Sequence, residues 1–169
     1  MYGYVISQAN EEDAEAVLKL QFLCYQSEAA LYDDYSIPPL VQSLTELQAE
    51  FKRSTVFVCR LKGEVIGSVR ATRLEDRCFI GRLMVHPRFQ RQGLGSKLMS
   101  AVEDHFQDAA FYELFTGHRS ENNLRLYQRL GYKQFKIEKV SQNLQLIFLE
   151  KPGTNKRRRV QTHQNTNDY

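Results

Sequence analysis

The fold is decided by the stretch from Ile80 to Leu98, which reads IGRLMVHPRFQRQGLGSKL. It begins with the apolar and β-branched residues of a short strand, which Pro87 ends because proline cannot donate to a strand ladder. The glycines Gly93 and Gly95 follow, and the apolar spacing of the next residues predicts a helix. The glycines let backbone approach a ligand, and the first N–H groups of a helix lack intrahelical partners. The stretch therefore predicts an anion site, typically one for phosphate.

Two common phosphate motifs do not match this stretch. A P-loop requires G-x-x-x-x-G-K-[ST], whereas here Gly95 is followed by Ser96 and then Lys97. The dinucleotide fingerprint requires a third glycine at the position of Leu98, together with an alternating βαβ context that the upstream sequence lacks. The stretch is therefore neither a nucleotide-binding P-loop nor a dinucleotide-binding loop.

The loop from Gln90 to Gly95 resembles the Q/R-x-x-G-x-G/A motif of the GNAT N-acetyltransferases, which bind acyl-CoA. The resemblance covers roughly residues 2 to 150. It implies that backbone groups on the preceding strand bind the pantetheine arm and that the Val85 N–H polarises the thioester carbonyl. It also implies that the loop binds the pyrophosphate. The cofactor-binding residues expected on this basis are Leu83, Met84, Val85, Gln90, Arg91, Gln92, Gly93, Leu94, Gly95 and Ser96.

A second stretch, Phe111 to Tyr132, carries the same resemblance. It predicts a strand, a loop, a helix from near Ser120, and Gly131 as a left-handed helix end. The family pattern N-x-x-L/A-Y-x-x-x-G-F/Y is matched by Asn123, Leu126, Tyr127, Gly131 and Tyr132. Asn123 and Tyr127 are four residues apart and share one helical face. The resemblance implies that Asn123 contacts the cofactor and that Tyr127 contacts it and acts as general acid.

For the general base and the acceptor pocket the sequence offers candidates with alternatives. Many family members carry an acid on the fourth strand, but here the residue before Leu83 is Arg82. Glu113 on the fifth strand is a catalytic candidate, with a water chain or an exposed structural role as alternatives. For the acceptor, aromatic and acidic residues that suit a cationic amine gather on the first helices. The candidates are Tyr25, Glu28 and Tyr32, although a helix face and polar loop would look the same.

The order of elements indicates an α/β (mixed α+β) domain. A strand near residues 2–7, two helices, three antiparallel strands, strand–helix–strand–helix and two final strands are expected. The resemblance implies the GNAT fold, a mixed, mostly antiparallel sheet of six or seven strands whose parallel fourth and fifth strands splay apart. Residues 1–151 form the expected domain, and residues 152–169 a polar, basic and mobile tail.

Composition excludes several other classes. The chain has 169 residues and no apolar run near the ~20 residues of a membrane span. Three cysteines without a C-x-x-C pair favour reduced thiols in the cytoplasm, and the four histidines show no metal-binding spacing, so no metal is expected. Of the net charge of +3, residues 151–169 hold five bases against one acid, which leaves −1 for the first 150 residues. No nucleic-acid or membrane partner is expected.

The sequence thus predicts an acetyl-CoA-dependent N-acetyltransferase that acts on a small-molecule primary amine by direct attack. Two alternatives stay open: a CoA-binding sensor or partner module without catalysis, and an acetyltransferase that acts on a protein or peptide amine. A homodimer also stays open. The identity of the amine cannot be read from the residues.

Overall fold

The computed structural model describes residues 3–154, and the rest of the expected C-terminal tail lies outside this range. The chain folds into a seven-stranded mixed sheet with the order β1-β2-β3-β4-β5-β7-β6. Its strands are β1 (Tyr4–Gln8), β2 (Thr55–Leu61), β3 (Glu64–Leu74), β4 (Arg77–Val85), β5 (Phe111–Gly117), β6 (Lys133–Lys139) and β7 (Gln145–Pro152). Its α-helices are α1 (Ala14–Cys24), α2 (Gln26–Tyr32), α3 (Pro38–Val41), α4 (Leu44–Arg53), α5 (Leu94–His105) and α6 (Glu121–Arg129).

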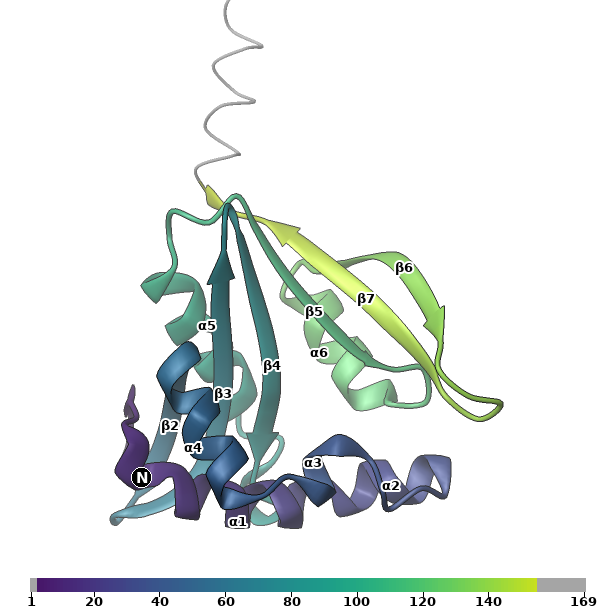
Figure 1. Ribbon diagram of the computed structural model, residues 1–169. Coiled ribbons are helices and arrows are strands. Elements are labelled where there is room, and N and C mark those ends of the chain that lie inside the picture. Colours follow the sequence, from purple (N-terminus) through teal and green to yellow (C-terminus); the bar gives the residue numbers. More distant parts are fainter. Residues whose placement is uncertain (1–2, 155–169) are drawn as a thin grey trace, which may run out of the picture.

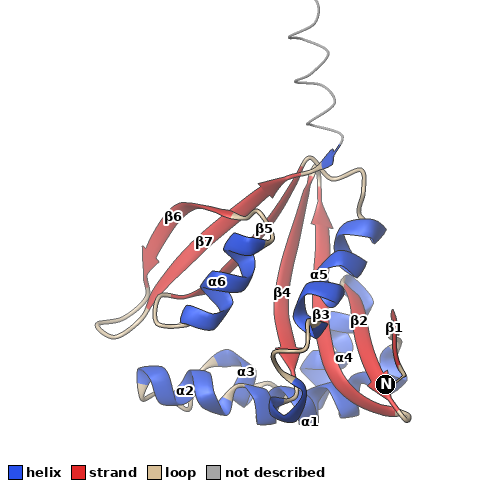
Figure 2. Ribbon diagram, turned by 180° about the vertical axis from the view of Figure 1, so that it is seen from behind, coloured by secondary structure: helices blue, strands red, loops and turns tan. Residues whose placement is uncertain are grey.

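The N-terminal half of the sheet, β1 to β4, is antiparallel and covered on both faces. Helices α1 and α4 pack on one face (Figure 1), and α5 packs on the other (Figure 2). Two apolar clusters result: Leu47, Val58 and Met84 belong to the α1 side, and Leu98 and Val102 belong to the α5 side. Burying each such aliphatic side chain stabilises the fold by about 1.5–3 kcal/mol.

The parallel pair β4 and β5 is joined only at its beginning. Pairing is limited to three positions, the last being Phe79 with Glu113. Beyond that point the two strands diverge into a wedge (Figure 1). The position opposite Val69 on β3 is occupied by both Arg82 and Leu83, and Arg82 adopts a left-handed φ of 52°. This bulge bends β4 where it leaves β5.

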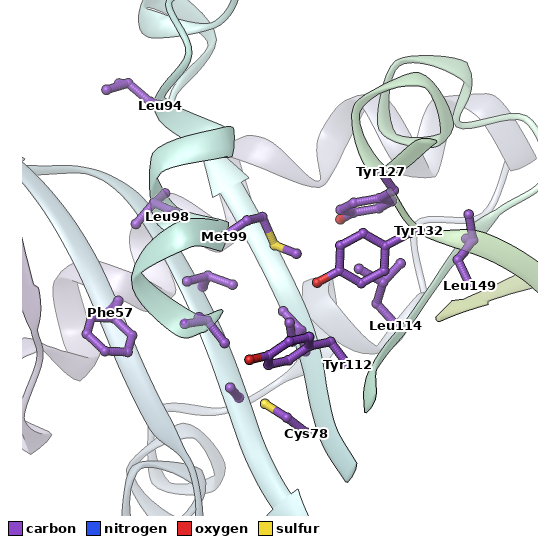
Figure 3. Packing of buried hydrophobic residues seen from close by; sticks show 14 of the residues in the cluster. Phe57, Cys78, Leu94, Leu98, Met99, Tyr112, Leu114, Tyr127, Tyr132 and Leu149 are labelled. Atoms are coloured by element: carbon purple, nitrogen blue, oxygen red, sulfur yellow. The ribbon is translucent and has the colours of Figure 1, made fainter. Parts of the chain in front are cut away.

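The C-terminal half consists of β5, β7 and β6, with α6 packed against it (Figure 2). Gly131 ends α6 with a φ of 93°, in the left-handed region that the sequence predicts. Tyr127 and Tyr132 from this end of α6 pack against the residues of α5 (Figure 3). The mixed sheet with splayed parallel strands confirms the expected fold class.

Several element boundaries differ from the sequence-based expectation. The first long helix is two helices, because Tyr25 adopts a φ of −86° and a ψ of 0° between α1 and α2. The second expected helix is also two helices, α3 and α4, and Ser43 and Glu46 form a capping box at the start of α4. Pro152, assigned to the tail from the sequence, is the last residue of β7, and the Gly153 N–H donates to the Ala110 carbonyl at 2.8 Å.

Candidate functional site

A cleft of about 1130 Å³ opens where β4 and β5 separate. It is bounded by the end of α1 and the start of α2, by the edge of β4, by the loop into α5, and by α6. Of the residues selected from the sequence, Tyr25, Glu28, Leu83, Met84, Val85, Gln90, Arg91, Gly93, Leu94, Gly95, Ser96 and Asn123 line it. The structure thus brings together residues that are up to 98 positions apart. Four selected residues do not line the cleft: Gln92, Tyr32, Glu113 and Tyr127, of which Tyr127 is close to the cleft residues Tyr25 and Glu28.

The N-terminus of α5 presents backbone donors to the cleft. Gly93, with a φ of 81°, and Arg91, with a φ of 60°, both take left-handed conformations that curve the loop. The first backbone hydrogen bond of α5 runs from the Lys97 N–H to the carbonyl of Gly93, at 3.1 Å. Among residues 3–154 the N–H groups of the preceding turn of α5 have no acceptor. Such a curved loop and helix N-terminus form an anion-binding site.

The edge of β4 supplies a further free donor at Val85. The His86 N–H donates to Ile66 on β3 at 2.8 Å, so the alternation of an antiparallel ladder turns the Val85 N–H and carbonyl toward the wedge. The Val85 carbonyl accepts from the Gln90 side chain at 3.1 Å and from the Cys24 thiol at 3.5 Å. The Val85 N–H makes no hydrogen bond within the described part of the chain. It can therefore polarise a carbonyl oxygen placed in the wedge.

Helix α6 contributes Asn123 and Tyr127 from one face. The Asn123 amide lies 3.5 Å from the Thr116 hydroxyl on β5, which holds this helix against the wedge. Tyr127 is 6% exposed, and its hydroxyl makes no hydrogen bond with any described residue. Figure 3 shows its hydroxyl turned toward α5 and β4, above the neighbouring Tyr132 ring. Burial, reinforced by Tyr25 and Glu28 nearby, raises the pKa of Tyr127, so it stays protonated and able to donate.

Helix α2 closes the cleft from the other side. Glu28 lines the cleft, and one of its carboxylate oxygens accepts from the Ser120 hydroxyl at 2.5 Å. The Tyr32 hydroxyl accepts from the Arg119 N–H at 3.0 Å, and the Tyr32 ring lies 5.7 Å from that of His118. Tyr32 therefore anchors α2 to the loop after β5 rather than lining the cleft.

Glu113 lies away from the cleft, at the joined end of the wedge. Its carboxylate pairs with Arg77 at 3.0 Å, and the same guanidinium pairs with Glu150 at 2.8 Å. The parallel register explains this contact. Arg77 lies opposite Phe111, two residues before Glu113, so Arg77 and Glu113 are on the same face of the sheet. The geometry gives Glu113 a structural role in joining the two strands.

Several cleft residues were not selected from the sequence. They are Cys24, Ser27, Leu31, Phe89, His118, Arg119, Ser120, Glu121, Asn122, Arg125, Leu126 and Arg129. Arg125 and Arg129 are four residues apart and share one helical face with each other and with Asn122, a spacing that could have marked all three. The others approach through tertiary contacts that no local pattern indicates. Residues 3–154 contain no group of His, Cys, Asp and Glu arranged for a metal ion.

The chain belongs to the acetyltransferase (GNAT) family, whose model matches residues 15–132. The UPF0157 protein YqkA of Bacillus subtilis is 29% identical over 133 residues, which are 79% of this chain but 38% of that protein. The chain thus spans well under half of this relative's length.

Solved structures share the fold at low sequence identity. The ribosomal-protein-S18-alanine N-acetyltransferase from Escherichia coli superposes with a TM-score of 0.73 at 18% identity, over 89% of this chain and 94% of the other. The PaiA N-acetyltransferase from Thermoplasma acidophilum, solved in complex with coenzyme A, gives 0.74 at 16% identity over 89% and 99%. YncA from Salmonella typhimurium, solved with acetyl-CoA, gives 0.70 at 18% identity over 89% and 94%. In residues 3–154 no helix is long and apolar enough to cross a membrane.

Proposed function

We propose that the protein transfers an acetyl group from acetyl-CoA to a primary amine by direct attack. The amine nitrogen forms a bond to the thioester carbonyl carbon, the C–S bond breaks, and CoA leaves as its thiol. The observation that carries this proposal is one cleft that holds free N–H donors on both β4 and α5 beside the buried Tyr127. In this reading the α5 N-terminus binds the pyrophosphate and the Val85 N–H stabilises the developing oxyanion.

Two protons must move during this reaction, one from the amine and one to the sulfur. Tyr127 gives its proton to the departing sulfur, which its hydroxyl can do because no acceptor among the described residues engages it. A phenol of raised pKa is a weaker acid than the thiol, so this transfer must accompany cleavage of the C–S bond. Glu28, rather than Glu113, receives the amine proton. It lines the cleft, and the Ser120 hydrogen bond engages only one of its two carboxylate oxygens.

A thiol-release screen tests the proposal. The full chain is incubated with acetyl-CoA and a panel of polyamines, amino acids, aminoglycosides and peptides with free N-termini, and CoA thiol is measured against an amine-free control. The proposal expects amine-dependent release from at least one class and an acetylated amine by mass spectrometry. Binding of acetyl-CoA without turnover on any amine would overturn it in favour of a CoA-binding module without catalysis.

A peptide or protein N-terminus is the second acceptor class. The similarity to the E. coli enzyme that acetylates a ribosomal-protein alanine favours including it, since that enzyme has the same fold. A peptide acceptor would turn over faster than the free amino acid that forms its first residue. The same screen separates the two classes, because both are present in one panel.

A further inference from the structure

A half-buried cation without a counter-ion lies on β4 beside the wedge. Arg82 lies on the β4 bulge, next to the strand segment that lines the cleft. No carboxylate among residues 3–154 lies within 4.0 Å of its guanidinium, and its Nε is buried without a hydrogen-bond partner. A buried N–H without an acceptor and a cation without a counter-ion both cost free energy, so their presence beside a cleft points to an anionic ligand.

The neighbouring polar cluster does not neutralise Arg82. Arg70 on β3 is 5% exposed, pairs with Glu50 at 2.6 Å and is also bonded by the buried Gln21. Its own Nε is likewise buried and without a partner. The Glu50 carboxylate thus pairs with Arg70 and leaves Arg82 without a paired carboxylate. Charges removed from water are normally paired in proteins, so the Arg82 guanidinium suits an anion from outside the chain.

Tyr25 connects this cation to the cleft. Its ring lines the cleft, and the Arg82 guanidinium carbon lies 5.8 Å from the ring centroid. Tyr25 is also close enough to Glu28 for the two to interact electrostatically. Burial raises the pKa of Tyr25, an effect that Arg82 partly opposes and Glu28 adds to, so the ring is neutral and cannot serve as the counter-ion. A carboxylate that lines the cleft and a guanidinium without a counter-ion thus lie near the same aromatic ring.

We propose that the acceptor is an amino acid, whose carboxylate pairs with Arg82 while its amino group lies at Glu28. This inference rests on the proposed function and names the substrate class. A guanidinium binds a carboxylate through two parallel hydrogen bonds, which gives direction as well as affinity. A negative and a positive group near the same ring match an acceptor that carries both an amino group and a carboxylate. A simple cationic amine would leave Arg82 without a partner.

The experiment compares acceptors that differ only in the carboxylate. Each amino acid is assayed beside its amide and its decarboxylated amine, with wild type, Arg82→Gln, Arg82→Lys and the control Arg53→Gln. Arg53 is exposed at the end of α4 and forms no ion pair with any residue from 3 to 154, so its change alters net charge equally without touching the wedge. Wild type should prefer the acid over the amide by about 10–100-fold in kcat/KM, as expected for one charge-assisted hydrogen-bonded pair.

The variants should separate acceptor binding from cofactor binding. Arg82→Gln should abolish the preference, Arg82→Lys should keep part of it, and Arg53→Gln should keep all of it. Acetyl-CoA affinity, measured by calorimetry, should stay unchanged in all three. Equal use of acid and amide by wild type, or an unchanged preference in Arg82→Gln, would overturn the inference while leaving the acetyltransferase proposal intact.

A binding measurement keeps the inference testable if no amine turns over or Arg82→Gln does not fold. An N-acetyl amino acid and its amide are titrated into wild type by calorimetry, which requires neither turnover nor a variant. The inference expects the acid to bind at least about 10-fold more tightly than the amide. Equal affinities would overturn it, whereas absent turnover together with selective acid binding would overturn only the acetyltransferase proposal.

Discussion

Replacing Tyr127 by phenylalanine isolates catalysis from stability. The Tyr127 hydroxyl makes no hydrogen bond within the described residues, so its removal breaks no internal contact and leaves the ring packing against Tyr132 intact. We expect the free energy of unfolding to change by less than about 0.5 kcal/mol. Loss of the general acid should lower kcat by ~10²–10⁴-fold, because proton transfer to the departing sulfur contributes a factor of that size.

Tyr132→Phe is the matched control within the same pair of rings. Tyr132 is 2% exposed, and its hydroxyl donates to the Glu103 carboxylate at 2.9 Å. Removing a hydrogen bond to a charged acceptor should cost about 1.5–3 kcal/mol in the free energy of unfolding, with turnover preserved. The two variants should therefore have opposite effects. Tyr127→Phe loses activity and keeps stability, whereas Tyr132→Phe loses stability and keeps activity.

The assay combines urea unfolding, acetyl-CoA titration and steady-state thiol release for wild type and both variants. Tyr127→Phe should retain acetyl-CoA affinity, because the loss is confined to the transition state. A Tyr127→Phe enzyme with unchanged kcat would refute the reasoning and leave Tyr127 as a core aromatic. An equal loss of unfolding free energy in both variants would refute the claim that the Tyr127 hydroxyl is free.

Three further outcomes are expected. Glu28→Gln keeps the Ser120 contact but removes the charge, so kcat/KM for amines should fall ~10²-fold or more with unchanged acetyl-CoA affinity, and a wild-type value would exclude Glu28 as the proton acceptor. Gly117→Ala should cost about 1–3 kcal/mol in urea unfolding, because a Cβ would overlap the Tyr32 hydroxyl and come within 2.6 Å of its ring carbon; a neutral effect would contradict the tight packing of α2 on β5. Burial raises the pKa of the Cys24 thiol to about 12, so its reactive thiolate form becomes abundant only as the pH approaches that value. Ellman's reagent should therefore react slowly with the folded protein at pH ~8 and quickly after denaturation. Fast reaction of Cys24 in the folded protein would contradict the raised pKa.

Local chemistry made the loop and helix face proposed for the cofactor predictable. Gly93 requires a left-handed conformation, and its place between a strand and an amphipathic helix predicts the loop that the structure contains. Asn123 and Tyr127 could be assigned to one face because helical spacing alone places them there. These predictions depend on interactions between residues near one another in the chain.

The part of the cleft proposed for the acceptor could not be predicted because it depends on contacts between distant elements. The break at Tyr25 has no proline or glycine to mark it, and it redirects α2 so that Glu28 meets Ser120. Glu113 looked available on its strand, yet the parallel register brings it to Arg77, 36 positions earlier in the chain. Arg82 read as a departure from the family pattern, and only the bulge on β4 shows its charge beside the wedge.

The central claim is that the cleft binds acetyl-CoA through the N-terminus of α5, and Gly95→Val addresses it. A Cβ at Gly95 would lie 3.3 Å from the Leu126 side chain and 3.8 Å from that of Leu83, which both line the cleft. The new side chain would therefore project across the free N–H groups while requiring only small shifts of two leucines. Several charge-assisted hydrogen bonds, each contributing ~1.5–3 kcal/mol, would be blocked.

The decisive measurement is calorimetric titration of acetyl-CoA into wild type and Gly95→Val, with thermal melting to establish that both are folded. The account predicts stoichiometric binding to wild type and an affinity at least ~100-fold weaker in the variant. Near-equal affinity in a folded Gly95→Val protein would contradict it.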